Sequence, residues 1–320
     1  MTSTPPSGEA GLLARMLPHL SPSPLAEVGP GDDAAVLRLP SSRLVVSTDT
    51  LTEGVDFLPG VITPTQLGRR AAVQNLADIA AMGARPHALV VSVTAPAGTD
   101  GGVFEEIAAA LGARAEADGA HVVGGDLGRG DLLSLTVTAL GTLAAGEVPV
   151  LRSGARPGDL LAVGTERLGR SAAGLAVVLA GRDEPAELVA FHHAPEVDLR
   201  LGWTVGRAAS AMLDLSDGLV RDGGRIAAAS RVVIDLDPDA LAPDIEALRP
   251  PARDEAEARA WVLHGGEEHA MLATFPPGAV PAGFRVLGAV RAPAAGEEPA
   301  ILLGGDRIPG GGFDHFADGS

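Results

Sequence analysis

The chain contains no cysteine and no lysine. Without cysteine it has no disulfide, no thiolate nucleophile and no cysteine-based zinc or iron–sulfur site. The 24 Lys+Arg residues are therefore all arginine, which excludes the lysine of a P-loop, the ATP-contacting lysine of protein kinases and Schiff-base chemistry. An enzyme of this composition that handles phosphates must use arginine, backbone N–H groups or metal ions.

Aromatic side chains and positive charge are also scarce. Aromatic residues make up 3% of the chain and the net charge is −17, while 46% of the 320 residues are hydrophobic. That content allows one large or two ordinary cores, filled mainly by aliphatic residues and alanine. The negative charge argues against a nucleic acid as the main partner. Since no apolar run reaches membrane-spanning length and no signal peptide is visible, we expect a cytoplasmic protein without a membrane partner.

Strands and helices alternate in both halves of the sequence, which predicts an α/β (α+β) fold with mixed sheets and flanking helices. A loop rich in turn residues at 152–159 precedes a strand predicted at 160–163. We therefore place the domain boundary near residue 150, with domains at 1–149 and 150–320. The mixture of Pro, Asp, Glu and Ala over 238–259 predicts a surface excursion.

One stretch organises the candidate chemistry. A short apolar run at 44–46 breaks into hydroxyls and carboxylates over 47–57, as in a buried strand that delivers hard oxygen ligands from its end. Three further segments, at 31–33, 75–78 and 214–217, also contain aspartates that could bind a cation. Each alone is more typical of an ordinary acidic turn. Together they favour a multi-metal site, and carboxylates without His or Cys neighbours favour Mg²⁺.

A glycine-rich strand end at 121–130 adds a phosphate-binding element. Gly125 permits close approach of backbone N–H groups to phosphate, and Asp126 can hold a cation. A glycine-rich hairpin is the alternative for this segment. Arg129 or Arg152 would supply directed donors to a nucleotide. Phosphoryl transfer fits this set of glycine N–H groups, carboxylates and arginines, because catalysis of such a transfer is largely positioning and charge stabilisation.

The order and spacing of nine motifs resemble the thiamine-monophosphate kinase family, within the group of ATP-using enzymes that includes aminoimidazole ribonucleotide synthetase and selenophosphate synthetase. The resemblance covers nearly the whole chain. The motifs are GDDAAVL at 31–37, STDTLTEGVDF at 47–57, NLADIAAMGARP at 75–86, GGD at 124–126, RSGARPGD at 152–159, GRSAAGLA at 169–176, DLSDGL at 214–219, HGGEEHAML at 264–272 and GFDHF at 312–316.

This resemblance implies direct transfer of the γ-phosphoryl group of ATP to thiamine monophosphate, assisted by several Mg²⁺ ions. The implied Mg²⁺ ligands are Asp32, Ser47, Thr48, Asp49, Asp78, Asp126, Asp214 and Asp217. Of these, the implied catalytic residues are Asp49, Asp78, Asp126 and Asp217. The implied ATP contacts are Gly125, Asp126, Arg152 and Ser216. The implied contacts with the thiamine end are Asp56, Glu267 and Phe313.

The resemblance further implies a two-domain aminoimidazole ribonucleotide synthetase-like fold. The N-terminal domain would bind ATP and metal and pair with a second copy in a homodimer, and the C-terminal domain would complete the ATP cleft. Two departures fall on the acceptor side: Asp56 stands where the family usually has His, and GGEEHAM at 265–271 stands where it usually reads GGEDYEL. Another acceptor in the same enzyme group, or a non-catalytic nucleotide-binding protein, are therefore the alternative functions.

Overall fold

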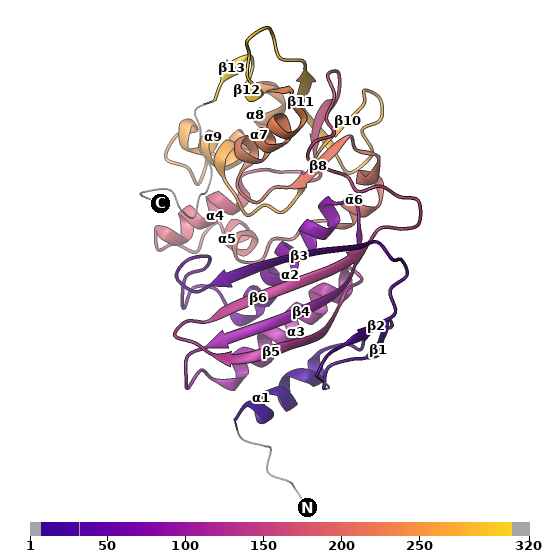
Figure 1. The fold of residues 1–320 in the computed structure, drawn as a ribbon. Helices are drawn as coiled ribbons and strands as arrows, with labels where there is room; N and C mark the ends of the chain where they lie inside the picture. Colours follow the sequence, from indigo (N-terminus) through magenta and orange to yellow (C-terminus); the bar gives the residue numbers. More distant parts are fainter. Residues whose placement is uncertain (1–7, 32, 309–320) are drawn as a thin grey trace, which may run out of the picture. The chain divides into compact units, whose positions relative to one another are not determined.

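A computed structural model describes residues 8–31 and 33–308 of the chain. The chain divides into two compact units, which we call the N-terminal unit (1–79 and 84–147) and the C-terminal unit (80–83 and 148–320). Each unit has its own mixed sheet with helices packed on it (Figure 1). The predicted α/β class with mixed sheets and flanking helices is thereby confirmed.

The N-terminal unit is built on a four-stranded sheet in the order β3-β6-β4-β5. β6 is antiparallel to both of its neighbours, β3 and β4, while β4 and β5 run parallel. β3 and β5 are therefore the two edges of the sheet. The strands are β3 (Leu44–Thr52), β4 (Arg85–Ala95), β5 (His121–Arg129) and β6 (Ser134–Thr142).

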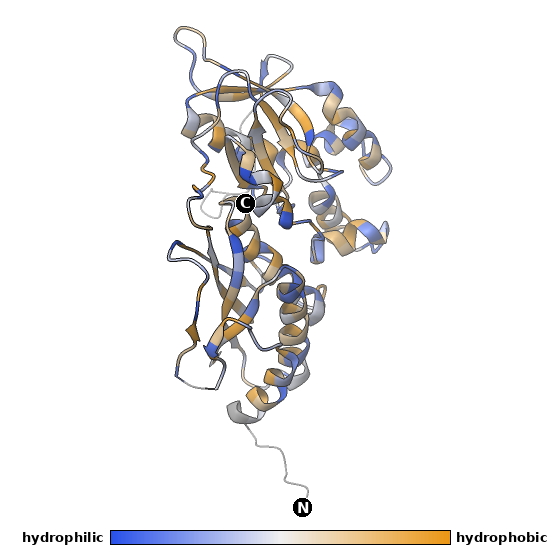
Figure 2. Ribbon diagram, turned by 90° about the vertical axis from the view of Figure 1, so that its right-hand side faces the viewer, coloured by the Kyte–Doolittle hydropathy of each residue, from blue (hydrophilic) through white to orange (hydrophobic). Residues whose placement is uncertain are grey.

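Two helices, α2 (Pro64–Ala81) and α3 (Gly101–Ala117), cover one face of this sheet, and Figure 2 shows both on the same side of the strands. Their packing is close at Gly68, where an added Cβ would lie 2.5 Å from the Ile107 carbonyl oxygen. Asp100 caps α3, since its side chain accepts the Gly102 N–H at 2.7 Å. Small side chains on α2 thus bring the two helices together over the sheet.

The opposite face, which we call the open sheet face, carries the other half of the alternating strand residues. Leu44, Val46 and Val90 are 47%, 54% and 39% exposed there. In β3 the exposed residues alternate with inward-facing ones, as expected for a strand with one covered face. The remaining elements of the unit are α1 (Glu9–Met16), η1 (Leu17–His19), β1 (Ala26–Val28) and β2 (Val36–Leu37).

The C-terminal unit contains a seven-stranded sheet in the order β13-β12-β9-β11-β7-β10-β8. Neighbouring strands are antiparallel except for the parallel pair β12 and β9. The buried residues of its central strands are almost all aliphatic. The strands are β7 (Leu160–Val163), β8 (Ala211–Asp214), β9 (Val233–Leu236), β10 (Met271–Phe275), β11 (Arg285–Arg291), β12 (Ala300–Leu303) and β13 (Asp306–Arg307).

Helices of the C-terminal unit pack against this sheet and against one another. None of the helices within the described ranges is long and apolar enough to cross a membrane. The helices are α4 (Arg170–Leu179), α5 (Ala186–His193), α6 (Arg200–Trp203), η2 (Val205–Ala208), α7 (Leu219–Ser230), α8 (Pro238–Leu248) and α9 (Glu255–His264).

The predicted surface excursion over 238–259 is wrong, because this segment contains all of α8 and the first half of α9. Asp237 starts α8 by accepting the Asp239 N–H at 2.9 Å, and Pro238 occupies the first turn. Asp254 starts α9 by accepting the Glu257 N–H at 2.9 Å. An aspartate directly before a proline or a glutamate is a recognised helix start. The two N-cap aspartates therefore indicated helices, although the composition of the whole segment resembles a loop.

We expect opposite effects from two helical Gly→Ala substitutions. Gly68→Ala should lower the free energy of unfolding by roughly 1–3 kcal/mol, because the new methyl group meets backbone atoms of α3. Gly224→Ala, in α7 with open space around the position, should raise it by roughly 0.5–1 kcal/mol. Denaturant titration measures both; equal effects would contradict the close approach of α2 and α3.

Candidate active site

The middle of β3, at 47–49, and the facing turn of α2, at 75–78, form an oxygen-rich corner in the N-terminal unit, so these oxygen ligands lie within the strand and not at its end as the sequence predicted. Ser47 and Asp49 alternate with Thr48, so their side chains share the face toward α2. The Ser47 hydroxyl donates to Asp78 Oδ2 at 2.5 Å. The Asp49 N–H donates to Asn75 Oδ1 at 3.1 Å, which ties the strand to α2 three residues before Asp78. The structure therefore brings three of the predicted metal ligands to one corner.

Thr48 lies on the other side of the same strand. Its hydroxyl donates to the Val137 carbonyl at 3.0 Å and lies 3.1 Å from Thr138 Oγ1, both in β6. Its side chain is exposed on the open sheet face, away from Ser47 and Asp49.

Asp126 is also separated from this corner. It lies in β5, one sheet edge, whereas Asp49 lies in β3 at the other edge, three strand spacings or about 14 Å away. Asp126 pairs with Ser92, which pairs with Thr136 on the open sheet face. The neighbouring position 125 requires glycine for packing, since a Cβ there would lie 2.0 Å from the Val91 carbonyl oxygen.

A second acidic corner lies in the C-terminal unit, where β8 ends at Asp214 and a loop leads into α7. Asp222 is fully buried and accepts the N–H groups of Ser216 at 3.0 Å and Asp217 at 2.9 Å. Arg225 bonds both Asp222 and Asp217, each at 2.5 Å. Burial raises the pKa of Asp222 to about 6, against the lowering effect of these hydrogen bonds and of Arg225.

Sequence reasoning missed Asp222 and Arg225. The available signal was an acid on the otherwise apolar face of a helix, since Leu219, Val220 and Ile226 are buried around it. A carboxylate at such a position must find donors, and here it finds the backbone of the loop that carries Ser216 and Asp217.

Segment 267–269 is bonded to the same loop. The Ser216 carbonyl accepts the Glu267 N–H at 2.8 Å, and the Leu215 carbonyl accepts the Glu268 and His269 N–H groups at 3.1 and 2.7 Å. These bonds hold Glu267, a predicted acceptor contact, beside Ser216, a predicted nucleotide contact. The two motifs that contain them, DLSDGL and HGGEEHAML, are therefore one structural element.

His269 is buried between two carboxylates. Its Nδ1 lies 3.2 Å from Asp214 Oδ2 and its Nε2 lies 3.3 Å from Glu267 Oε2. Burial lowers the pKa of His269, but the hydrogen bonds to Asp214 and Glu267 outweigh that effect and raise the pKa to about 10. The protonated ring donates from both nitrogens, which is the only way imidazole satisfies two carboxylates.

Glu268 points away from this pair, toward the start of α4. It is 1% exposed, and its Oε1 accepts the Ser171 N–H at 2.9 Å, in place of the side-chain cap that Gly169 cannot provide. The nearby Arg170 guanidinium lies 3.6 Å from the centre of the Phe191 ring. Burial raises the pKa of Glu268 to about 7, against the lowering effects of the α4 N–H groups and Arg170.

The other predicted site residues lie as follows. The Arg152 carbonyl accepts the Ser230 hydroxyl at 2.9 Å. Since Ser230 ends α7 and Ser216 precedes it, 12 residues of helix, or about 18 Å, separate these two predicted ATP contacts. Asp56 Oδ2 accepts the Thr52 N–H at 2.7 Å and so closes its own turn. The predictions for two residues fall outside the described ranges: Asp32 and Phe313.

The donor chemistry fits Mg²⁺, since the side chains of both corners offer mainly hydroxyl and carboxylate oxygens. Within residues 8–31 and 33–308, no group of three or more His, Cys, Asp or Glu residues has the arrangement of a metal centre by itself. In the oxygen-rich corner the Ser47 hydroxyl bonds the Asp78 carboxylate, and Asp49 lies on the same face of β3 as Ser47. Water and phosphate oxygens complete Mg²⁺ shells of this kind.

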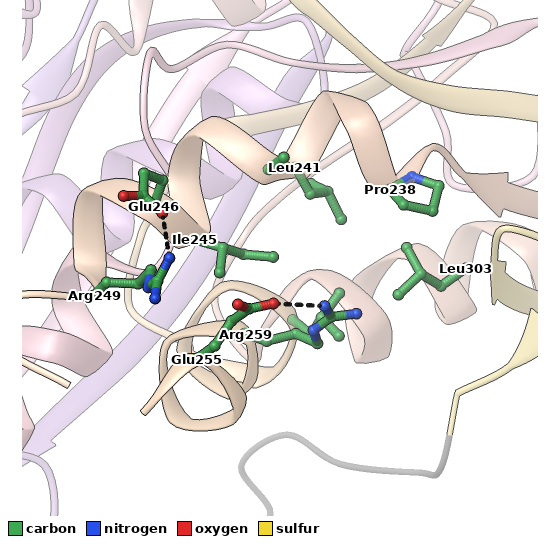
Figure 3. A pocket seen from close by; sticks show the side chains of 10 residues that line it. Pro238, Leu241, Ile245, Glu246, Arg249, Glu255, Arg259 and Leu303 are labelled. Carbon is green, nitrogen blue, oxygen red and sulfur yellow. Dashed lines mark hydrogen bonds and ion pairs between the residues drawn. The ribbon is translucent and has the colours of Figure 1, made fainter. Parts of the chain in front are cut away.

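A hollow between α8 and α9 is separate from both corners. Its walls are Leu241, Ile245 and Leu303, and Figure 3 shows two ion pairs at its rim. In these pairs Arg249 bonds Glu246 at 3.0 Å and Arg259 bonds Glu255 at 3.3 Å. Because both arginines are neutralised locally, the hollow offers no net charge to an anionic ligand.

The fold and the acidic segments define a class of protein. A family model described as "AIR synthase related protein, N-terminal domain" matches residues 31–143, which include β3, α2 and the oxygen-rich corner. This part of the chain is therefore similar to the N-terminal domain of AIR synthase-related proteins.

Individual relatives narrow the class. The thiamine-monophosphate kinase of Mycobacterium tuberculosis (strain ATCC 25618 / H37Rv) is 43% identical over 97% of this chain and 92% of its own length. The crystal structure of thiamine-monophosphate kinase from Stenotrophomonas maltophilia K279a is 28% identical with a TM-score of 0.78, covering 93% of this chain and 95% of that one. AaThiL complexed with AMPPCP and TMP is 27% identical with a TM-score of 0.78, covering 97% of both chains. The chain belongs to the thiamine-monophosphate kinase family.

The shifted pKa of Glu268 predicts a pH-dependent stability. Its folded pKa of about 7 exceeds the usual 4.5, so the folded state binds the proton more tightly. That contribution is full below about pH 4.5 and is lost as the pH rises through 7. Between pH 5 and 8 the wild type should lose about 3 kcal/mol of unfolding free energy relative to Glu268→Gln, which cannot ionise.

Urea titrations of both proteins across this pH range measure the difference. Glu298→Gln, at an exposed position, is the matched control and should follow the wild type at every pH. Parallel curves for the wild type and Glu268→Gln would contradict the proposed cost of ionising this buried carboxyl.

Proposed function

We propose that the chain transfers the γ-phosphoryl group of ATP directly to thiamine monophosphate and so forms thiamine diphosphate. The observation that carries the proposal is the 43% identity to a thiamine-monophosphate kinase over 97% of this chain. The oxygen-rich corner supports it, because it supplies the hard ligands that phosphoryl transfer requires in a chain without lysine.

We propose that Mg²⁺ ions bind at both acidic corners. When bound, Mg²⁺ neutralises charge on the transferring phosphoryl group. The Ser47 hydroxyl orients Asp78, Asn75 fixes the backbone of Asp49, and Asp222 fixes the loop of Asp217. The proposed ligands are Asp32, Ser47, Thr48, Asp49, Asp78, Asp126, Asp214 and Asp217.

The nucleotide and acceptor contacts complete the proposal. We assign the ATP contacts to Gly125, Asp126, Arg152 and Ser216. We assign the acceptor to Asp56, Glu267 and Phe313. Glu267 suits this role because its side chain is 35% exposed while one oxygen is held by His269. A phosphate acceptor with a second pKa of about 6 needs no strong general base.

A homodimer through the open sheet face is the proposed assembly. The exposed Leu44, Val46 and Val90 would be covered in it. The position of Asp126, about 14 Å from Asp49 across the sheet of one chain, supports the same proposal. In the dimer, Asp126 of the partner subunit would serve a site at β3, the edge strand that carries Thr48 on the open sheet face and Asp49 on the other.

We expect the purified protein with ATP and Mg²⁺ to convert thiamine monophosphate to thiamine diphosphate and ADP. Asp49→Asn should lower kcat by at least about 100-fold, because a bound metal ion stabilises the charge of the transition state by several kcal/mol and the variant loses a proposed ligand. Asp306→Asn, an exposed position in β13, is the matched control and should retain wild-type turnover. Product analysis by chromatography and circular dichroism of each variant are the measurements.

Two results would contradict the proposal in different ways. ATP turnover only with a different acceptor would replace thiamine monophosphate as the substrate. Mg²⁺-dependent ATP binding without turnover on any acceptor would indicate a non-catalytic nucleotide-binding protein. Wild-type kcat in Asp49→Asn would remove Asp49 from the metal site and leave the acceptor unchanged.

Mixed dimers test the contribution of the second copy. Asp49→Asn and Asp126→Asn should each be inactive alone, but a heterodimer of the two should regain up to about half of wild-type activity, because one of two symmetric sites is intact. A heterodimer of Asp49→Asn and Asp78→Asn is the control and should stay inactive, since both residues lie in one corner. Equal activity of the two heterodimers would contradict a shared site.

A further inference from the structure

His269 connects the two halves of the C-terminal corner. It is 1% exposed, and its two ring nitrogens face Asp214 Oδ2 and Glu267 Oε2 at 3.2 and 3.3 Å. Asp214 is a proposed metal ligand and Glu267 a proposed acceptor contact. The imidazole ring thus bridges these two carboxylates.

The backbone around His269 is held in an unfavourable conformation. Glu267 has φ 62° and His269 has φ 51°, two of three non-glycine residues with positive φ in the part of the chain that the structure describes. A positive φ at a non-glycine residue costs free energy, and this conformation persists only where surrounding contacts hold it. Here the carbonyls of Leu215 and Ser216 supply those contacts by accepting the N–H groups of all three residues 267–269.

We propose that His269 is a positioning residue that fixes the carboxylates of Asp214 and Glu267 relative to each other, so that binding of the Mg²⁺-nucleotide and binding of the phosphorylated acceptor are coupled. The inference rests on the function proposed above and adds a residue that links its two ligands. Neither ligand needs to touch the ring for the coupling to operate.

The side-chain chemistry explains why histidine suits this position. Imidazole is a rigid ring with a nitrogen on each side, so rotation that improves one hydrogen bond changes the other. A side chain with a single hydroxyl donates one hydrogen bond and cannot bridge two carboxylates. A change at Asp214 is therefore transmitted to Glu267 through one rigid group, within a segment whose backbone is already bonded in place.

Two near-isosteric substitutions separate the two hydrogen bonds. His269→Asn places its amide nitrogen near the position of Nδ1, so it keeps the bond to Asp214 and loses the bond to Glu267. His269→Gln reaches the position of Nε2, so it keeps the bond to Glu267 and loses the bond to Asp214. Asn also tolerates positive φ better than most residues, which limits the structural cost of that variant.

We expect the two variants to have opposite binding profiles. His269→Asn should weaken thiamine monophosphate binding by about 10-fold and leave Mg²⁺-AMPPCP binding within about twofold, since it removes one hydrogen bond to a charged group and keeps the other. His269→Gln should weaken Mg²⁺-AMPPCP binding by a similar factor and spare the acceptor. In the wild type, each ligand should raise the affinity for the other; His269→Leu should remove this effect.

Calorimetric titration of each ligand, alone and with the other present, measures these affinities without turnover. Thermal melts of all variants check folding, and His264→Asn, on the neighbouring α9, is the control. Two variants that lose stability while keeping both affinities and their coupling would overturn the positioning role. A wild type that binds Mg²⁺-AMPPCP but not thiamine monophosphate would instead overturn the proposed acceptor.

Discussion

The acidic corner of the C-terminal unit depends on a short set of backbone hydrogen bonds. The carbonyls of Leu215 and Ser216 accept the N–H groups of residues 267–269, and the Leu215 N–H returns to the Ala270 carbonyl at 2.9 Å. β8 and β10, which pair antiparallel at Asp214 and Met271, bring these segments together. Because the bonds are made by the main chain, the side chains of the loop remain available for ligands.

The acids of the C-terminal corner illustrate how buried charge is accommodated in a chain without lysine. Asp222 is matched by two backbone N–H groups and Arg225, and Glu268 by the first turn of α4. His269 bridges Asp214 and Glu267. Each buried carboxylate therefore has donors supplied by the fold, as burial of charge requires. These donors also orient the neighbouring residues that we assign to ligands.

Much of the fold was predictable from local pattern. The strand predicted at 160–163 is β7. The apolar run at 44–46 also predicted a strand, but β3 continues to Thr52, so Ser47 and Asp49 lie within the strand and not at its end. Segment 238–259 was mispredicted, because its Pro and acidic residues resemble a loop in composition while acting as helix starts in position. Composition averages over a window, whereas a cap depends on one residue and its direct neighbours.

The sequence by itself determined the fold class, the family and the types of ligand atom, because strand alternation, motif order and residue chemistry are local properties of the chain. Only the tertiary structure decided which ligands meet. It joined Ser47 to Asp78, left Asp126 at the far edge of the sheet, and revealed Asp222 and His269 as the groups that hold the C-terminal corner. Strand order and loop pairing decide such proximity, and both depend on contacts between residues far apart in the chain.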